Sequence, residues 1–113
     1  MNDTTPPPHA FDPEWALRQL PEGHGEAWRV LFEHGSLELG IYAPRGHDPQ
    51  QPHTRDEIYV VISGTGYFRN GDQRHAFKPG DLLFVPAGVI HRFEAFSEDL
   101  ATWVIFYGPE GGE

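Results

Sequence analysis

The sequence predicts one all-β domain, an antiparallel sandwich or small barrel that carries a short helix at its N-terminal end. Two observations favour this fold class. First, the 113 residues include 13 glycines and 11 prolines, which separate short apolar segments at short intervals. Second, these segments follow a period of two, as where Leu37, Leu39 and Ile41 alternate with Glu38 and Gly40. A chain of this length forms a single domain that buries roughly two-thirds of its unfolded surface.

Composition divides the chain into four parts. Residues 1–10 are polar and rich in proline, which predicts a flexible tail. Residues 11–25 are expected to form a helix and a loop, and residues 26–108 carry the strand pattern of the barrel. The glycine-rich residues 109–113 are expected to form a second flexible tail.

One helix is expected ahead of the strands. Asp12 supplies a capping carboxylate, Pro13 suits the first helical position, and Glu14 places an acid in the first turn. The helix is expected to run from Pro13 to Leu20, where Pro21 ends it. Its apolar side chains would let it lie against a sheet, either in its own monomer or on a partner subunit.

The strands follow from short apolar runs between turn signals. The clearest turn is Asn70-Gly71, a dipeptide that favours a tight hairpin. The run from Glu57 to Ile62 is almost continuously apolar, as in a strand that is covered on both faces. Strands are expected at residues 27–34, 37–43, 57–62, 67–69, 74–77, 81–85, 91–96 and 102–107.

Charge and composition exclude several classes of partner. There are 8 basic and 17 acidic residues, and the resulting net charge of −9 repels nucleic-acid phosphates and anionic lipids. No apolar run approaches the ~20 residues of a membrane span, and the first residues lack the pattern of a secretory signal. The absence of cysteine excludes disulfides and thiolate metal sites. We therefore expect a cytoplasmic protein that binds neither nucleic acid nor membranes.

Two separate segments place metal-binding side chains at the mouths of apolar strands. The polar residues between His53 and Glu57 must turn the chain, because a straight strand would hold the two about 13 Å apart. A carboxylate at the head of a buried strand is costly unless it is paired or bound to a metal. His91 opens the strand after the turn at Pro86, Ala87 and Gly88. We expect a cation between His53, Glu57 and His91. Gln51 is a candidate fourth ligand, as a weaker oxygen donor.

Two imidazoles and one carboxylate would leave open positions on the cation for substrate, water or O₂. This set suits Fe(II), Mn(II), Ni(II), Co(II) or Zn(II), and the sequence does not order them.

Strand alternation predicts which side chains lie beside such a metal: Tyr59, Val61, Phe93 and Trp103. For Trp103, the alternative is a simple role in the core. Tyr59 is the one candidate catalytic residue, because its hydroxyl could donate a hydrogen bond to a substrate. The alternative is a core tyrosine whose hydroxyl is satisfied within the protein.

The segment from Gly80 to His91 resembles the second sequence motif of the cupin superfamily. That motif, G-x5-P-x-G-x2-H-x3-N, is matched at Gly80, Pro86, Gly88 and His91, and Ala95 stands at the position of its asparagine.

The earlier segment is similar to the first cupin motif at His53, Glu57 and Gly64, and has Gln51 at the position of the family's first histidine. The resemblance covers roughly residues 37–107 and implies a small double-stranded β-helix, also called a jelly-roll or cupin barrel. It further implies a metal inside the barrel and a homodimer.

Three functions are compatible with these features. The resemblance and the open coordination favour a metal-dependent enzyme that acts on a small organic molecule as a dioxygenase, isomerase or lyase. The alternative is a non-catalytic barrel that binds or senses a small ligand. The third is a structural dimer with a vestigial site.

Overall fold

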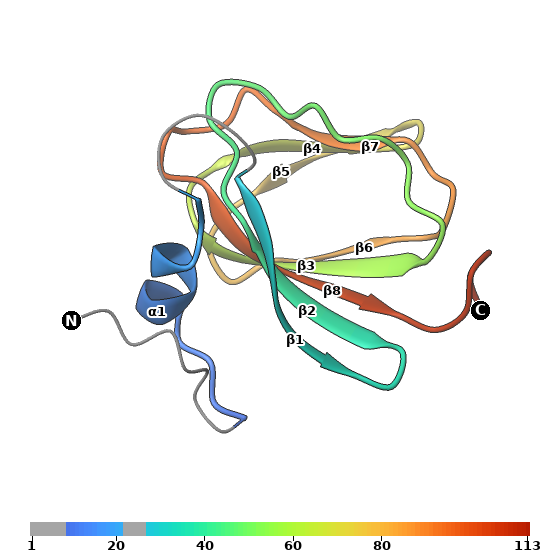
Figure 1. Cartoon of the computed structure of the whole chain (residues 1–113). Coiled ribbons are helices and arrows are strands. Elements are labelled where there is room, and N and C mark those ends of the chain that lie inside the picture. Colours follow the sequence, from blue (N-terminus) through green and yellow to red (C-terminus); the bar gives the residue numbers. More distant parts are fainter. Residues whose placement is uncertain (1–8, 22–26) are drawn as a thin grey trace.

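The computed structural model describes residues 9–21 and 27–113, in which one short helix precedes eight strands (Figure 1). Helix α1 spans Pro13–Arg18, two residues shorter than expected. Its predicted start is confirmed, because the Asp12 carboxylate accepts a hydrogen bond of 3.0 Å from the backbone N–H of Trp15. Within the described ranges, no helix has the length and apolar character needed to cross a bilayer. The tail expected at 1–10 lies outside the described residues apart from residues 9 and 10.

All eight predicted strands are confirmed, and each observed boundary lies within two residues of the expected one. The strands are β1 (Trp28–His34), β2 (Leu37–Tyr42), β3 (Asp56–Ser63), β4 (Gly66–Asn70), β5 (Gln73–Phe77), β6 (Leu82–Val85), β7 (His91–Glu94) and β8 (Ala101–Tyr107).

The strands form two antiparallel sheets that face each other across the interior (Figure 1). The larger sheet has the order β1-β2-β8-β3-β6 and the smaller has the order β5-β4-β7. The predicted hairpin joins β4 to β5, and Asn70 pairs with Gln73 across its turn. Strands that are neighbours in the sheet are often distant in sequence. For example, β3 pairs with both β6 and β8. This arrangement confirms the all-β prediction.

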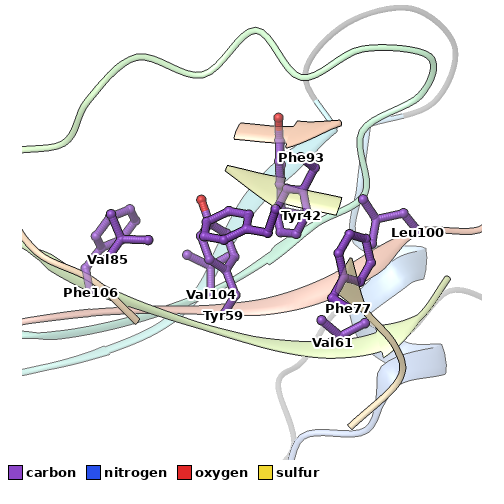
Figure 2. Close-up of a cluster of buried hydrophobic side chains, with 10 residues drawn as sticks. Tyr42, Tyr59, Val61, Phe77, Val85, Phe93, Leu100, Val104 and Phe106 are labelled. Atoms are coloured by element: carbon purple, nitrogen blue, oxygen red, sulfur yellow. The ribbon is translucent and has the colours of Figure 1, made fainter. Parts of the chain in front are cut away.

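The main core lies between the two sheets, and Figure 2 shows its side chains. Tyr59 of β3 is fully buried and its ring lies edge-on to Phe68 of β4 and Phe93 of β7, at 5.5 and 5.0 Å between centroids. In the larger sheet, Tyr59 is directly opposite Val104 of β8, so both side chains point inward. Aromatic side chains from both sheets therefore hold the interior together.

The outer face of the larger sheet carries a second apolar cluster beneath α1 (Figure 1). Trp15 and Ala16 of the helix are buried there against Ile41 of β2, with Trp103 of β8 packed beside them. This confirms that the helix packs on a sheet of its own chain. It also corrects the expectation that Trp103 lines the interior. Trp103 is opposite Val60 in the register, and the neighbouring pair, Val104 and Tyr59, faces inward. Because side chains alternate along a strand, Trp103 and Val60 point to the outer face.

The C-terminal residues 109–113, which we expect to form a flexible tail, lie folded back against the start of β3. The backbone N–H of Gly111 donates to the Thr54 carbonyl at 2.6 Å, and that of Glu113 donates to the Asp56 carboxylate at 3.0 Å. Because these bonds reach the residues beside Glu57, the end of the chain supports the segment that carries the predicted site.

Candidate metal centre

The structure brings the three predicted ligands together from two distant parts of the chain. Glu57 is the second residue of β3, His53 lies in the loop before that strand, and His91 is the first residue of β7. One donor atom from each of the three side chains lies within 4.8 Å of the other two. The larger sheet supplies Glu57 and the smaller sheet supplies His91, so the cluster sits where the two sheets approach each other.

Backbone hydrogen bonds fix the loop before His91 against the loop before Glu57. The N–H of Gly88 donates to the His53 carbonyl at 2.7 Å, and the N–H of Ala87 donates to the Asp56 carboxylate at 2.9 Å. Gly88 has a φ of 80°, which a residue with a side chain rarely adopts. The cupin-like P-x-G sequence thus provides a turn whose backbone holds the two ligand segments side by side.

The cluster is closed on one side and open on the other. The side chains of Glu57 and His91 are 2% and 1% exposed, whereas that of His53 is 34% exposed. The Glu57 Oε1 atom lies 3.2 Å from Nε2 of His91 and 3.8 Å from Nε2 of His53. Of the three ligands, His53 is therefore the one that solvent reaches.

Two buried atoms at this point have no hydrogen-bond partner among the described residues: Glu57 Oε1 and His91 Nε2. His91 Nδ1 lies 2.9 Å from the Val89 carbonyl, an acceptor, and therefore carries the hydrogen of the neutral ring. The lone pair of His91 Nε2 consequently faces the Glu57 carboxylate. A positive charge is needed between them, and it can be a proton on the ring or a metal ion.

The electrostatics of the two histidines differ. Burial disfavours the charged form of His91, but the Glu57 carboxylate and the Val89 carbonyl outweigh it and raise the pKa of the ring. For His53, burial dominates and lowers its pKa, although the Glu57 carboxylate partly opposes this. A neutral imidazole is the form that binds a metal, so His53 is ready to act as a ligand near neutral pH.

Aromatic rings surround the cluster. The ring of Phe106 lies edge-on to His53 at 4.9 Å, and the rings of Tyr59 and Phe68 lie 6.1 and 6.2 Å from His91. Of the residues expected to line the site, Tyr59 is thus beside it, and Val61 and Phe93 belong to the core cluster between the sheets. Figure 2 places Val61 toward Phe77 and Leu100, away from Phe106.

The structure places the candidate fourth donor, Gln51, and its neighbour Gln50 differently. Gln51 is exposed, and it is the adjacent Gln50 whose Oε1 atom lies 3.3 Å from His53 Nε2. The same oxygen accepts a hydrogen bond of 2.6 Å from the Tyr59 hydroxyl. The segment before β3 belongs to no strand, so its side chains do not alternate regularly between two faces.

Asp48 is a buried residue near the site that the sequence did not single out. Its carboxylate accepts hydrogen bonds from the Tyr42 hydroxyl at 2.5 Å, from Gln50 Nε2 at 2.7 Å and from the Phe93 N–H at 2.8 Å. Asp48 thereby joins the loop before β3 to β2 and β7. Asp48-Pro49 gives only a turn signal in the sequence, so its burial was not foreseeable.

The residues present fit a divalent cation. Two imidazoles and a carboxylate are suitable ligands, and two of their donor atoms are buried without partners in the described structure. The set does not resemble a closed structural zinc site, which would use thiolates alone or with imidazoles, because the chain contains no cysteine.

Comparisons with known proteins agree with this reading of the fold. An uncharacterized protein of Streptomyces coelicolor is 39% identical over 86 residues, which cover 74% of this chain and 82% of that protein. Acireductone dioxygenase 2 of Arabidopsis thaliana is 38% identical over 96 residues. That match covers 79% of this chain and 50% of the dioxygenase, so the chain spans about half the length of this relative.

A crystal structure of a Klebsiella pneumoniae protein with a double-stranded β-helix domain matches with a TM-score of 0.73. The match covers 89% of this chain and 90% of that one at 16% identity, and it confirms the expected double-stranded β-helix. A family model described as Cupin domain matches residues 38–107. Because that match spans more than half of the sequence, the chain belongs to the cupin domain family.

Proposed function

We propose that this cupin is a metal-dependent enzyme that holds one divalent cation through His53, Glu57 and His91 and acts on a small organic molecule. The observation that carries the proposal is the pair of buried, unpartnered donor atoms, Glu57 Oε1 and His91 Nε2, 3.2 Å apart. Without a metal, the two atoms are compatible only if a proton on His91 Nε2 forms a buried ion pair with Glu57, whereas a cation would bind both lone pairs.

Each residue has a distinct part in this proposal. Glu57 holds the cation and compensates part of its charge, so it is not free to act as a general base. His91, tied to the Val89 carbonyl, presents a fixed lone pair, and His53 closes the ligand set on the exposed side. A metal bound here supplies Lewis acidity or activates O₂ at its open positions. Aromatic neighbours such as Phe106 exclude water and favour a partly apolar substrate.

A dioxygenase-like reaction is the best supported of the reaction types. Several relatives carry the name acireductone dioxygenase, and one of them is 38% identical over most of this chain. Because this chain spans only half of that protein, its substrate and activity are proposals and are not taken over from the relative.

The first test is metal binding. Protein purified without added metal or chelator is analysed for bound elements, and the metal-free form is titrated calorimetrically with Mn(II), Ni(II), Zn(II) and, without oxygen, Fe(II). We expect one ion per chain, and His53→Ala, Glu57→Ala and His91→Ala should each lose it while remaining folded. His75→Ala, which removes an exposed histidine of β5, is the matched control and should keep the ion.

The second test is activity. The metal-loaded protein is supplied with small aromatic or diketone-like compounds in air, and O₂ consumption and products are followed. Turnover that Glu57→Ala abolishes would support a dioxygenase. Stoichiometric metal without turnover in any assay would favour the non-catalytic ligand-binding barrel, and absence of metal binding would refute the site. The homodimer belongs to the same proposal, and sedimentation of the purified chain tests it.

A further inference from the structure

We propose that the side-chain oxygen of Gln50 is the fourth protein ligand of the metal, and that Asp48 and Tyr59 hold it in the orientation for binding. This inference rests on the proposed metal site and adds to it a neutral oxygen donor that stands outside the His53, Glu57 and His91 set.

The orientation of the Gln50 amide follows from its partners. Its Nε2 atom donates a hydrogen bond of 2.7 Å to the Asp48 carboxylate, which can only accept. Asp48 Oδ1 also accepts from the Gln50 backbone N–H at 3.2 Å, so both ends of the residue are tied to one carboxylate. Because a flipped amide would place two oxygens against each other, Oε1 must point away from Asp48 and toward the cluster.

The position of Oε1 suits a ligand. It lies 3.3 Å from His53 Nε2, and His91 Nε2 lies 3.2 Å from Glu57 Oε1. Two donors that each bind one cation at ~2.1 Å with an angle between 90° and 109° are about 3.0 to 3.4 Å apart. Both pairs of atoms therefore already have the spacing of adjacent ligands on a single ion.

A metal would change the role of this oxygen. Without one, the contact with His53 is a hydrogen bond only if the ring carries its hydrogen on Nε2. When Nε2 binds a cation that hydrogen is absent, and two lone pairs would face each other at 3.3 Å unless Oε1 binds the same cation. The Tyr59 hydroxyl, which donates to Oε1 at 2.6 Å, still leaves the oxygen a second lone pair.

An amide oxygen in this place has a consequence for metal choice. Oxygen donors suit Mn(II), whereas imidazole suits Ni(II) and Zn(II). A site with two histidines, one glutamate and Gln50 should therefore favour Mn(II) relative to Ni(II) more than a site in which a histidine replaces Gln50.

The experiment compares two adjacent glutamines. Metal-free wild type, Gln50→Ala and Gln51→Ala are titrated with Mn(II) and Ni(II), and the visible spectrum of each Co(II) complex is recorded. We expect Gln50→Ala to bind Mn(II) about 10- to 100-fold more weakly and to change the Co(II) spectrum. Gln51→Ala, which alters an exposed side chain of the same type, should leave both unchanged.

Gln50→His provides a second test, because it replaces the amide oxygen with an imidazole donor. It should raise the affinity for Ni(II) relative to Mn(II) by at least about tenfold. Thermal unfolding of each metal-free variant verifies that the fold is kept.

The outcomes separate the inference from the proposed function. If wild type binds one ion and both Gln50 variants keep its affinity, metal ratio and spectrum, the fourth-ligand role is overturned while the three-residue site stands. If wild type binds no ion, both proposals fall together.

Discussion

The Nε2 atom of His91 lies 3.2 Å from the Oε1 atom of Glu57, and neither atom has a hydrogen-bond partner in the described part of the chain. The opposite nitrogen of the ring is held by the Val89 carbonyl at 2.9 Å, so the ring cannot turn its hydrogen toward the carboxylate without losing that bond. This relationship couples the two sheets through one buried contact that requires a positive charge.

Metal removal should therefore lower the stability of the protein. A metal that binds only the folded state, present at about 100 times its Kd, adds ~2.7 kcal/mol to the free energy of unfolding. Differential scanning calorimetry with metal and with chelator measures this increment. Glu57→Gln, which keeps the size of the side chain but removes its charge, should abolish the increment, and His75→Ala should retain it. An equal increment in Glu57→Gln would contradict the role of the carboxylate.

Two strands show how much of the fold the sequence predicts. The strand β3 was predicted to within one residue at each end because its apolar run is bounded by polar residues and Gly64. In β8 both faces are apolar, since one packs in the core and the other under α1, so alternation could not tell which face Trp103 occupies.

The candidate site likewise contains residues that the sequence predicts and residues that it does not. His53, Glu57 and His91 are recognisable because their spacing accompanies strand and turn signals. Gln50 and Asp48 lie in an irregular loop where no periodicity links sequence position to direction, so only the three-dimensional structure identifies them.

The outer cluster should be energetically important but separate from the metal site. Trp15 is buried between α1 and the larger sheet, and Trp15→Ala should lower the free energy of unfolding by about 3–5 kcal/mol, as measured by urea denaturation. Because the cluster lies on the opposite face of the sheet, metal affinity should not change. Trp103→Phe provides the companion test, and a tenfold loss of metal affinity in either variant would contradict the separation of the two faces.

The Asp48 carboxylate should stabilise the loop before β3. It accepts hydrogen bonds from Tyr42, Gln50 and Phe93, and Asp48→Asn would set an NH₂ group against at least one of these donors. We expect a loss of about 1–3 kcal/mol in the free energy of unfolding, measured by urea denaturation of the metal-free protein. Tyr42→Phe removes one of the bonds and should cost less. Asp72→Asn, at the exposed β4–β5 turn, is the control and should be neutral.

Acid should remove a contribution of Glu94 to the smaller sheet. Glu94 of β7 accepts hydrogen bonds from Arg74 of β5 at 3.0 Å and from Arg69 of β4 at 3.1 Å. The bond from Arg74, followed by that from Arg69, lowers the pKa of Glu94 below its ordinary value of 4.5. The carboxylate therefore stabilises the fold at pH values above 4.5, and this stabilisation disappears as the pH falls through the lowered pKa of the folded state.

Urea denaturation of wild type and Glu94→Gln between pH ~7 and ~3 measures this effect. The difference in the free energy of unfolding should be small, because the three side chains are partly exposed to solvent, and it should vanish at the acidic end. High salt should also reduce it at neutral pH, because ions screen exposed charges. Glu98→Gln, at an exposed position in the loop after β7, should show no such dependence. A difference for Glu94→Gln that stays constant down to the lowest pH would mean that the arginines do not stabilise the ionised carboxylate.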